Sequence, residues 1–146
     1  MNILEKDGLC NRIVADSPDA ILFVDRDGII RLWNRGAELI FGYSANEALG
    51  QSLDLIVPEK LRQRHWEGYR QTMATGETRY GTKLLSVPAV NKDGRSLSCE
   101  FSIVLSRNEE DAVQGVAAIF RDVTDRFQRE KALKERLRAM EEDKRP

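Results

Sequence analysis

The sequence is poor in the residues that build metal clusters, disulfide frameworks and membrane spans. It holds two cysteines and one histidine among 146 residues. Neither Cys10 nor Cys99 has a second cysteine or histidine at zinc-site spacing, so the pattern excludes a structural zinc site and a disulfide framework. No apolar run approaches the length of about 18 residues that a membrane helix needs, and the N-terminus lacks a signal-peptide core. We therefore expect a protein of the reducing cytoplasm, without a membrane segment.

The chain also lacks an excess of positive or negative charge. Lys and Arg total 23 and Asp and Glu total 24, for a formal net charge of −1. This balance gives no electrostatic reason to expect nucleic acid as a partner. The chain also lacks a phosphate-binding glycine loop, a Ser/His/Asp set in a plausible order and, beyond surface runs, paired carboxylates on one element. We therefore expect no enzyme activity.

A β-hairpin is the clearest local signal that is present. Two apolar runs, residues 20–25 and 29–34, flank Arg26-Asp27-Gly28. An Asp-Gly pair suits a tight turn because glycine adopts positive φ without steric cost. Asn34 can cap a short helix that ends near Phe41. Ser44 and Glu47 then have capping-box spacing, which predicts a second helical turn.

The only histidine lies on the longest helix predicted within the domain, from about Glu59 to Thr75. Pro58 suits the start of this helix, and Gly76 suits its end. One stripe of the helix has inward spacing and contains the following residues: Leu61, His65, Gly68, Tyr69, Thr72 and Met73.

Three strands are predicted after this helix, within residues 78–90, 96–105 and 113–123. The second alternates apolar and polar side chains, with Cys99 on the apolar side. With the first hairpin, these strands make five. The fold class is therefore predicted as α+β, one five-stranded antiparallel sheet with helices over one face. The natural ligand site is a crevice between the helices and the sheet.

Helices are predicted to flank this domain at both ends. Residues 1–15 form an N-terminal amphipathic helix, residues 16–125 the domain, and residues 126–146 most of a charged C-terminal helix that begins near Thr124. Three apolar residues of the C-terminal helix have the spacing of a short coiled-coil seam: Leu133, Leu137 and Met140. The seam can lie on the sheet or pair with a second copy, and we favour a homodimer through the flanking helices.

Three segments resemble the PAS domain, a sensory fold common in bacterial signalling. They are SPDAILFVDRDGIIRLWNRGAELIFGYSANEALGQSL, the VNKDG turn, and FRDVTDR at the end of the last strand. The resemblance covers about residues 15–125. It implies a signal-transduction domain that acts on a partner such as a histidine kinase or a cyclic-nucleotide output domain.

Within this family, LIVPEKLRQRHWEGYRQTMATGE resembles the helix of haem-binding oxygen sensors from nitrogen-fixing bacteria. His65 precedes Asp93 of the next Asp-Gly turn by 28 residues, as the proximal haem histidine does in those sensors. The resemblance implies haem b, with His65 as the iron ligand, and sensing of O2, CO, NO or redox state. It places these residues around the cofactor: Tyr69, Leu85, Cys99, Phe101 and Ile103.

One position departs from the sensor pattern. Leu85 stands where the oxygen sensors carry an arginine that hydrogen-bonds bound oxygen. Without that donor, a polar oxygen adduct loses a charge-assisted bond, so sensing of CO, NO or redox state is as plausible. Lys83 is near this position.

The sequence also allows other interpretations of these residues and of the cofactor. His65 can also be a packing residue on an amphipathic helix, and Cys99 a small buried hydrophobe. Flavin-adduct photochemistry needs a cysteine that residues 50–60 lack, whereas flavin bound without a covalent link stays possible. A PAS module for dimerisation and protein interaction, with a small metabolite or no cofactor, is the alternative.

The end of the last strand carries a separate signal. In PAS domains an Asp-x-Thr motif, here Asp122 and Thr124, lies where the last strand passes into the exit helix. Capping by these residues is expected to fix that joint. Arg121, just before the motif, is expected to pair with an acidic residue near the hairpin.

Overall fold

The computed structural model describes residues 7–78, 81 and 83–144. In this part of the chain, five strands alternate with five α-helices and two 3-10 helices. In chain order the elements are α1 (Asp7–Asp16), β1 (Ala20–Asp25), β2 (Ile30–Trp33), α2 (Arg35–Phe41), α3 (Ala45–Ala48), η2 (Leu53–Leu55), η3 (Glu59–Leu61), α4 (Arg62–Thr75), β3 (Leu85–Val90), β4 (Ser96–Arg107), β5 (Val113–Asp122) and α5 (Thr124–Asp143).

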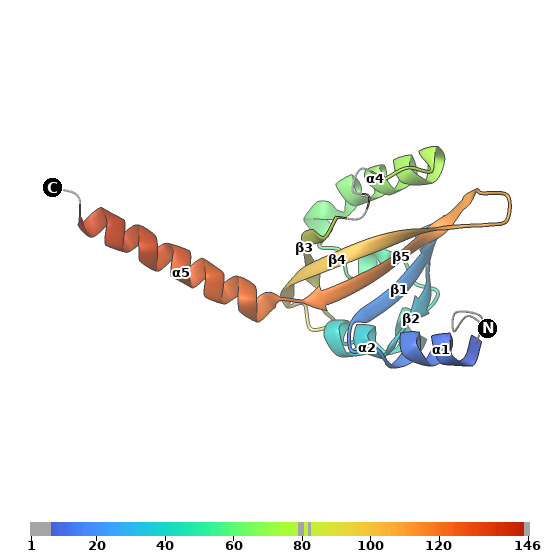
Figure 1. The fold of residues 1–146 in the computed structure, drawn as a ribbon, viewed down its shortest axis with the longest axis horizontal. Coiled ribbons are helices and arrows are strands. Elements are labelled where there is room, and N and C mark those ends of the chain that lie inside the picture. The colour runs from blue at the N-terminus through green and yellow to red at the C-terminus, as the bar shows by residue number, and fades with distance from the viewer. Residues whose placement is uncertain (1–6, 79–80, 82, 145–146) are drawn as a thin grey trace.

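The strands form one antiparallel sheet in the order β2-β1-β5-β4-β3. This confirms the predicted α+β class with five antiparallel strands. Because β1 pairs with β5, the first and last strands lie side by side in the middle of the sheet (Figure 1). The two flanking helices therefore leave from the same region of the domain.

The local signals around the first hairpin are confirmed. Asn34 caps α2 by accepting from the backbone of Ala37, and Gly42 ends this helix in the left-handed conformation. Ser44 and Glu47 make both hydrogen bonds of the capping box. Asn34 also donates through Nδ2 to backbone carbonyls that include those of Val14 and Asp19, so one buried amide joins α1, β1 and α2.

Two element boundaries differ from the prediction. The α-helix expected from Glu59 opens as η3 and becomes α-helical at Arg62. The strand expected over residues 78–90 is paired only from Leu85, and residues 79, 80 and 82 lie outside the described part. Pro88 is tolerated because β3 is an edge strand. Residues 1–6 of the predicted N-terminal helix lie outside the described part of the chain.

The buried core lies between the inner sheet face and the helices. Phe41 is fully buried, and its ring lies 5.5 Å from Trp33 and 5.6 Å from Phe120 between centroids. Phe120 in turn stacks on Phe101 at 4.7 Å. This aromatic chain links β2, α2, β5 and β4, so it ties most of the sheet to the helix layer.

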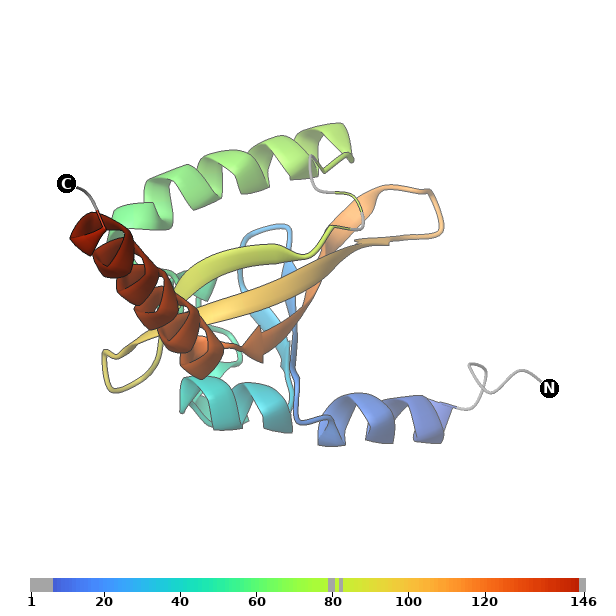
Figure 2. The same cartoon turned by 60° about the vertical axis from the view of Figure 1, so that its left-hand side comes forward.

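The exit helix α5 extends away from the sheet (Figures 1 and 2). Its seam residues Leu133, Leu137 and Met140 are each more than half exposed. The seam therefore does not lie on the sheet of its own chain, and its pairing with a second copy stays a prediction.

Candidate functional site

Helix α4 is anchored on the hairpin of β1 and β2 by its inward side chains. The Tyr69 hydroxyl contacts the backbone carbonyls of Val24, at 3.1 Å, and Asp25. Burial, assisted by the Asp25 carboxylate, raises the pKa of Tyr69 well above its usual value, so this hydroxyl stays protonated and donates. Near the end of the helix, Arg26 donates to the Met73 carbonyl at 3.4 Å.

Trp66 fixes the start of α4 against the same hairpin. Its indole nitrogen donates to the Asp54 carboxylate at 2.7 Å. Its ring lies over Gly28, where an added Cβ would come within 2.5 Å of the ring. Gly28 also has φ of +80°, so this turn needs glycine for its conformation and for the close contact.

His65 lies between these two anchors, partly buried beside Trp66 and Tyr69. Its ring centroid is 4.6 Å from that of Trp66 and 6.1 Å from that of Tyr69. Its Nδ1 atom is buried and has no hydrogen-bond partner within the described residues. Burial lowers the pKa of His65, against an opposing effect of the Asp54 carboxylate. The imidazole is therefore held neutral, the form that binds a metal.

The other face of the helix is exposed to solvent. Arg64 and Arg70 are both exposed. Gly68, predicted on the inward stripe, is exposed as well, and nothing lies within 4 Å of the Cβ that it lacks. Its predicted inward position is wrong, because Trp66, Tyr69 and Met73 set the inward side of α4. Gly68 therefore offers no close approach of a flat ring to the helix backbone.

The remaining predicted site residues lie together on the inner face of β3 and β4. Leu85 pairs with Phe101 across these strands, and Ile103 pairs with Ala118 of β5. Leu85, Phe101 and Ile103 are only half-buried although they face the helix layer. The helices therefore leave this end of the apolar inner face incompletely covered. Phe101 and Ile103 pack on the edge of the same core as Trp66 and Tyr69.

Cys99 lies deeper on the same strand and is almost fully buried. Burial, together with the Asp122 carboxylate, raises the pKa of its thiol to about 11. The thiol is thus protonated at neutral pH and is a poor metal ligand or nucleophile. Its contribution to a site on this face is apolar contact.

The donor set limits which metal group could fit here. In the part of the chain that the structure describes, no three His, Cys, Asp or Glu side chains gather as metal ligands. A single neutral imidazole suits a metal that brings most of its own ligands, as iron does within haem. The neutral imidazole of His65 and the half-buried apolar side chains of β3 and β4 fit such a group.

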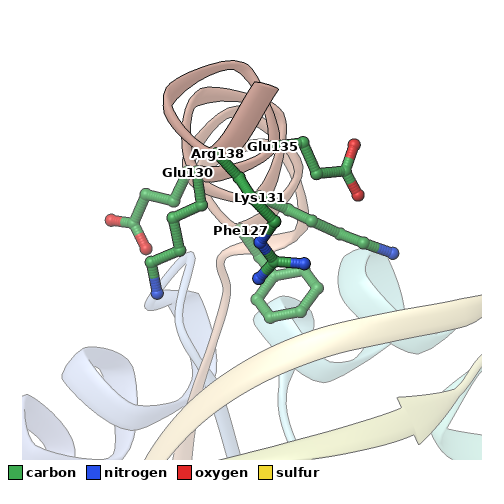
Figure 3. Close-up of a pocket in the computed structure, with 6 residues that line it drawn as sticks. Phe127, Glu130, Lys131, Glu135 and Arg138 are labelled. Atoms are coloured by element: carbon green, nitrogen blue, oxygen red, sulfur yellow. The ribbon is translucent and has the colours of Figure 1, made fainter. Parts of the chain in front are cut away.

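Two hollows stand out among the described residues, and neither lies at His65. One, of about 370 Å³, follows α5 between mostly charged side chains, with Phe127 directed toward the domain (Figure 3). The other, of about 260 Å³, includes Leu84, Ile119 and Arg121 on the outer sheet face. The crevice predicted between helices and sheet is marked by incomplete burial of its walls at Leu85, Phe101 and Ile103.

The joint between the sheet and α5 follows the prediction for Asp122, which accepts from the helix start, whereas Thr124 contacts β4 and does not cap the helix. Asp122 accepts from the backbone of Thr124 at 3.0 Å and from its hydroxyl. The same hydroxyl accepts from the backbone of Ser98 at 3.0 Å, and the Ser98 carbonyl accepts from Val123 at 2.8 Å. The first turn of α5 is therefore tied to β4, the strand that carries the predicted pocket wall.

Two ion pairs reinforce this joint. Arg126 pairs with Glu100 of β4, and Arg121 pairs with Asp19 at 3.3 Å. The second pair supplies the acidic partner that the sequence could not name. Sequence reasoning missed Asp54, Ser98 and Glu100, because no local pattern shows which strand or helix each would meet.

No helix in the described part of the chain combines the length and the apolar character that crossing a bilayer requires.

Comparison with sequences of known proteins gives partial matches to bacterial sensors. The chain is 46% identical over 48 residues to the sensor protein FixL of Bradyrhizobium diazoefficiens, which covers 33% of this chain and 10% of FixL. It is 29% identical over 134 residues to the signal transduction histidine-protein kinase AtoS of Escherichia coli, which covers 89% of this chain and 21% of AtoS. The chain thus spans only a small part of these relatives.

The fold matches solved structures over nearly the whole domain. A PAS domain of a protein from Colwellia psychrerythraea superposes with a TM-score of 0.70 at 24% identity, over 85% of this chain and 99% of that chain. The family model described as PAS fold matches residues 8–123. This chain therefore belongs to the PAS family, whose domains are typical of signal transduction.

Proposed function

We propose that this PAS domain binds haem b through His65 and senses a diatomic gas or redox state. The observation that carries the proposal is a partly buried, neutral imidazole, with Nδ1 unpartnered among the described residues, in a domain whose apolar inner sheet face is incompletely covered. An unpaired buried nitrogen costs free energy, so its presence favours a function over a packing role. The similarity of 48 residues of this chain to the sensor protein FixL supports the same interpretation.

The residues have distinct roles in this proposal. His65 would hold the iron, and Tyr69 would position α4 through its bonds to β1. Leu85, Cys99, Phe101 and Ile103 would provide apolar contact from β3 and β4. When bound, haem supplies an iron centre that takes up a diatomic ligand or changes oxidation state. Since Leu85 offers no hydrogen bond, CO, NO or redox state would be sensed as readily as oxygen.

The signal would leave through β4. Phe101 and Cys99 point inward from this strand, while Ser98 and Glu100 hold the base of α5. A ligand that shifts the inner face would alter contacts on both sides of one strand. The chain itself would carry no catalysis and would act on an output partner. The match to a histidine kinase favours a kinase as that partner, and a cyclic-nucleotide output domain is the other choice.

An absorption spectrum of the purified chain tests the cofactor. We expect a haem Soret band after purification or addition of haem, and its loss in His65→Ala. Arg64→Ala is the matched control, because Arg64 is the exposed neighbour on the same helix and should leave the band unchanged. A protein that stays colourless after haem is added would contradict the proposal, and a flavin spectrum would replace it.

An alternative function is a dimerisation and protein-interaction module that needs no haem. The exposed seam of Leu133, Leu137 and Met140 favours it, because an apolar stripe on a free helix is a typical pairing surface. In that case His65→Ala would leave the function unchanged. Truncation after Asp125 would abolish self-association, and an unchanged mass after truncation would contradict pairing through α5.

A further inference from the structure

Trp66, the residue after the histidine, is held in place by three separate contacts. Its indole nitrogen donates to the Asp54 carboxylate at 2.7 Å. Its six-membered ring lies against the turn at Gly28, where an added Cβ would come within 2.5 Å of it. The indole also packs edge-to-face on Tyr69, with 5.3 Å between ring centroids. The indole of Trp66 therefore has little freedom to rotate, although it is only partly buried.

The carboxylate that holds the indole is itself well placed. Asp54 lies in η2, between the hairpin and α4 in the chain. The backbone of its neighbour Leu53 donates to the Gly28 carbonyl at 3.1 Å, which joins η2 to the hairpin turn. Arg62, the first residue of α4, donates to the Asp54 carbonyl at 3.2 Å. Asp54 therefore has a defined position relative to both the hairpin and the start of α4.

His65 lies beside two aromatic rings that are anchored in this way. The Trp66 ring is inclined by 77° to the imidazole, and the Tyr69 ring by 27°. The Tyr69 hydroxyl donates to the Val24 carbonyl at 3.1 Å. Each ring next to the imidazole thus carries a polar group that η2 or the hairpin holds, so the rings limit the rotation of the imidazole.

The buried nitrogen of the imidazole does not fix its orientation. Nδ1 of His65 has no hydrogen-bond partner among the described residues. A histidine that binds a metal is normally oriented by a hydrogen bond from its second ring nitrogen to a carboxylate or a carbonyl. Here the Asp54 carboxylate accepts from Trp66 instead. The influence of this carboxylate on the imidazole therefore passes through the indole ring.

We propose that Asp54 is a positioning residue for His65, and that it fixes the orientation of the imidazole by holding the Trp66 indole. Its role as support for an iron ligand rests on the proposed function. The orientation itself does not, because it arises from contacts among the chain's own residues. Two residues outside the set predicted from the sequence thereby join the candidate site.

Nuclear magnetic resonance of the chain prepared without haem tests the orientation directly, because the chain has a single histidine. In wild-type protein we expect one set of imidazole signals, with nuclear Overhauser effects to the rings of Trp66 and Tyr69. Asp54→Ala removes the acceptor, and Trp66→Phe removes the donor but keeps an aromatic ring. In both variants the imidazole should sample several rotamers, so the couplings that report its χ1 angle should average and its Overhauser effects to Tyr69 should be lost.

A conservative variant separates the position of Asp54 from its charge. Asp54→Asn keeps an oxygen that accepts from the indole but carries no charge, so it should retain the wild-type couplings. Glu67→Gln is the matched control, because it removes an exposed carboxylate from α4 and leaves the contact between Asp54 and Trp66 in place.

Two results would overturn the proposal. One is wild-type couplings in Asp54→Ala, and the other is equal averaging in Asp54→Asn and Asp54→Ala, which would assign the effect to charge. Unchanged amide signals from β4 and β5 should confirm that each variant is folded. Should Asp54→Ala fail to fold, Trp66→Phe carries the test, and wild-type couplings to Tyr69 in that variant would contradict the proposal.

Haem affinity gives a second, independent measurement. Loss of a residue that orients a metal-binding histidine typically lowers metal affinity by about 10–100-fold, so we expect Asp54→Ala and Trp66→Phe to bind haem about 10-fold more weakly. Asp54→Asn should bind like the wild type. Unchanged affinity in Asp54→Ala would contradict a role of Asp54 in supporting an iron ligand. A wild-type protein that takes up no haem would contradict the proposed function instead, and the resonance experiment would still decide whether Asp54 orients His65.

Discussion

The two sides of the helix layer are packed to different degrees. On the α2 side, Phe41 and Ala37 are fully buried, and Trp33 and Phe120 close around them. On the α4 side, Met73 is the only buried residue of the helix, at 8% exposure, and His65 retains a nitrogen with no partner among the described residues. The opposite sheet residues Leu85, Phe101 and Ile103 are half-buried there.

Within this one core, the α2 side therefore contributes mainly to stability, and the α4 side holds the candidate site. Close packing on the α2 side buries large apolar side chains such as Phe41 and Trp33, and apolar burial is the main favourable term in folding. Helix α4 depends more on polar contacts at its two ends, to Asp54 and to the hairpin. Regions with fewer buried contacts open at lower free energy and commonly accept ligands. The comparison can be tested by mutations on each side.

The largest expected effect is on the α2 side. Phe41→Ala should lower the free energy of unfolding by about 3–5 kcal/mol, because it leaves a cavity between Trp33 and Phe120. Leu39→Ala, at a 64% exposed position of the same helix, should change it by less than about 0.5 kcal/mol. Urea denaturation measures both. Equal losses would show that the α2 side is not specially packed.

A smaller effect is expected where the hairpin meets α4. Gly28→Ala should cost about 2 kcal/mol, since the left-handed backbone is strained and Trp66 must move. Gly50→Ala has the same backbone strain, with φ of +86°, but nothing lies within 4 Å of the new Cβ. The difference between the two variants in denaturation isolates the Trp66 contact. If Gly28→Ala lowers the free energy of unfolding no more than Gly50→Ala does, Trp66 and α4 move aside for the new Cβ without a measurable cost.

The smallest effect concerns the pH dependence of stability. Burial lowers the pKa of folded His65, so the unfolded chain takes up a proton first as pH falls below about 6.5. The free energy of unfolding should therefore decrease in that range, while above it His65 is neutral in both states and contributes no pH dependence. Denaturation at about pH 7.5 and about pH 5.5 should show a smaller decrease for His65→Gln. Identical decreases would mean that His65 is not buried in solution.

Much of the fold could be predicted because its signals are local. The turn at Gly28, the cap at Asn34 and the capping box at Ser44 each depend on a few neighbouring residues. Alternating apolar residues in β4 identified its inner face in the same way. The start of β3 could not be predicted, because pairing with β4 decides it and the sequence before Leu85 has no clear pattern.

The candidate site was predicted less completely. His65 and Tyr69 could be placed on one face of a helix, and Cys99, Phe101 and Ile103 on one face of a strand. Periodicity does not show how closely a helix covers a sheet. The outward position of Gly68 was missed for this reason, since the contacts of Trp66 and Tyr69 rotate the helix.

The sequence by itself determined the elements, their caps and the PAS resemblance, because these arise from interactions over one or two turns of chain. Only the tertiary structure decided that Arg121 meets Asp19, that Tyr69 reaches the carbonyl of Asp25, and that Ser98 holds Thr124. These contacts join residues far apart in sequence, and sheet closure places them. The same closure leaves Nδ1 of His65 without a partner among the described residues.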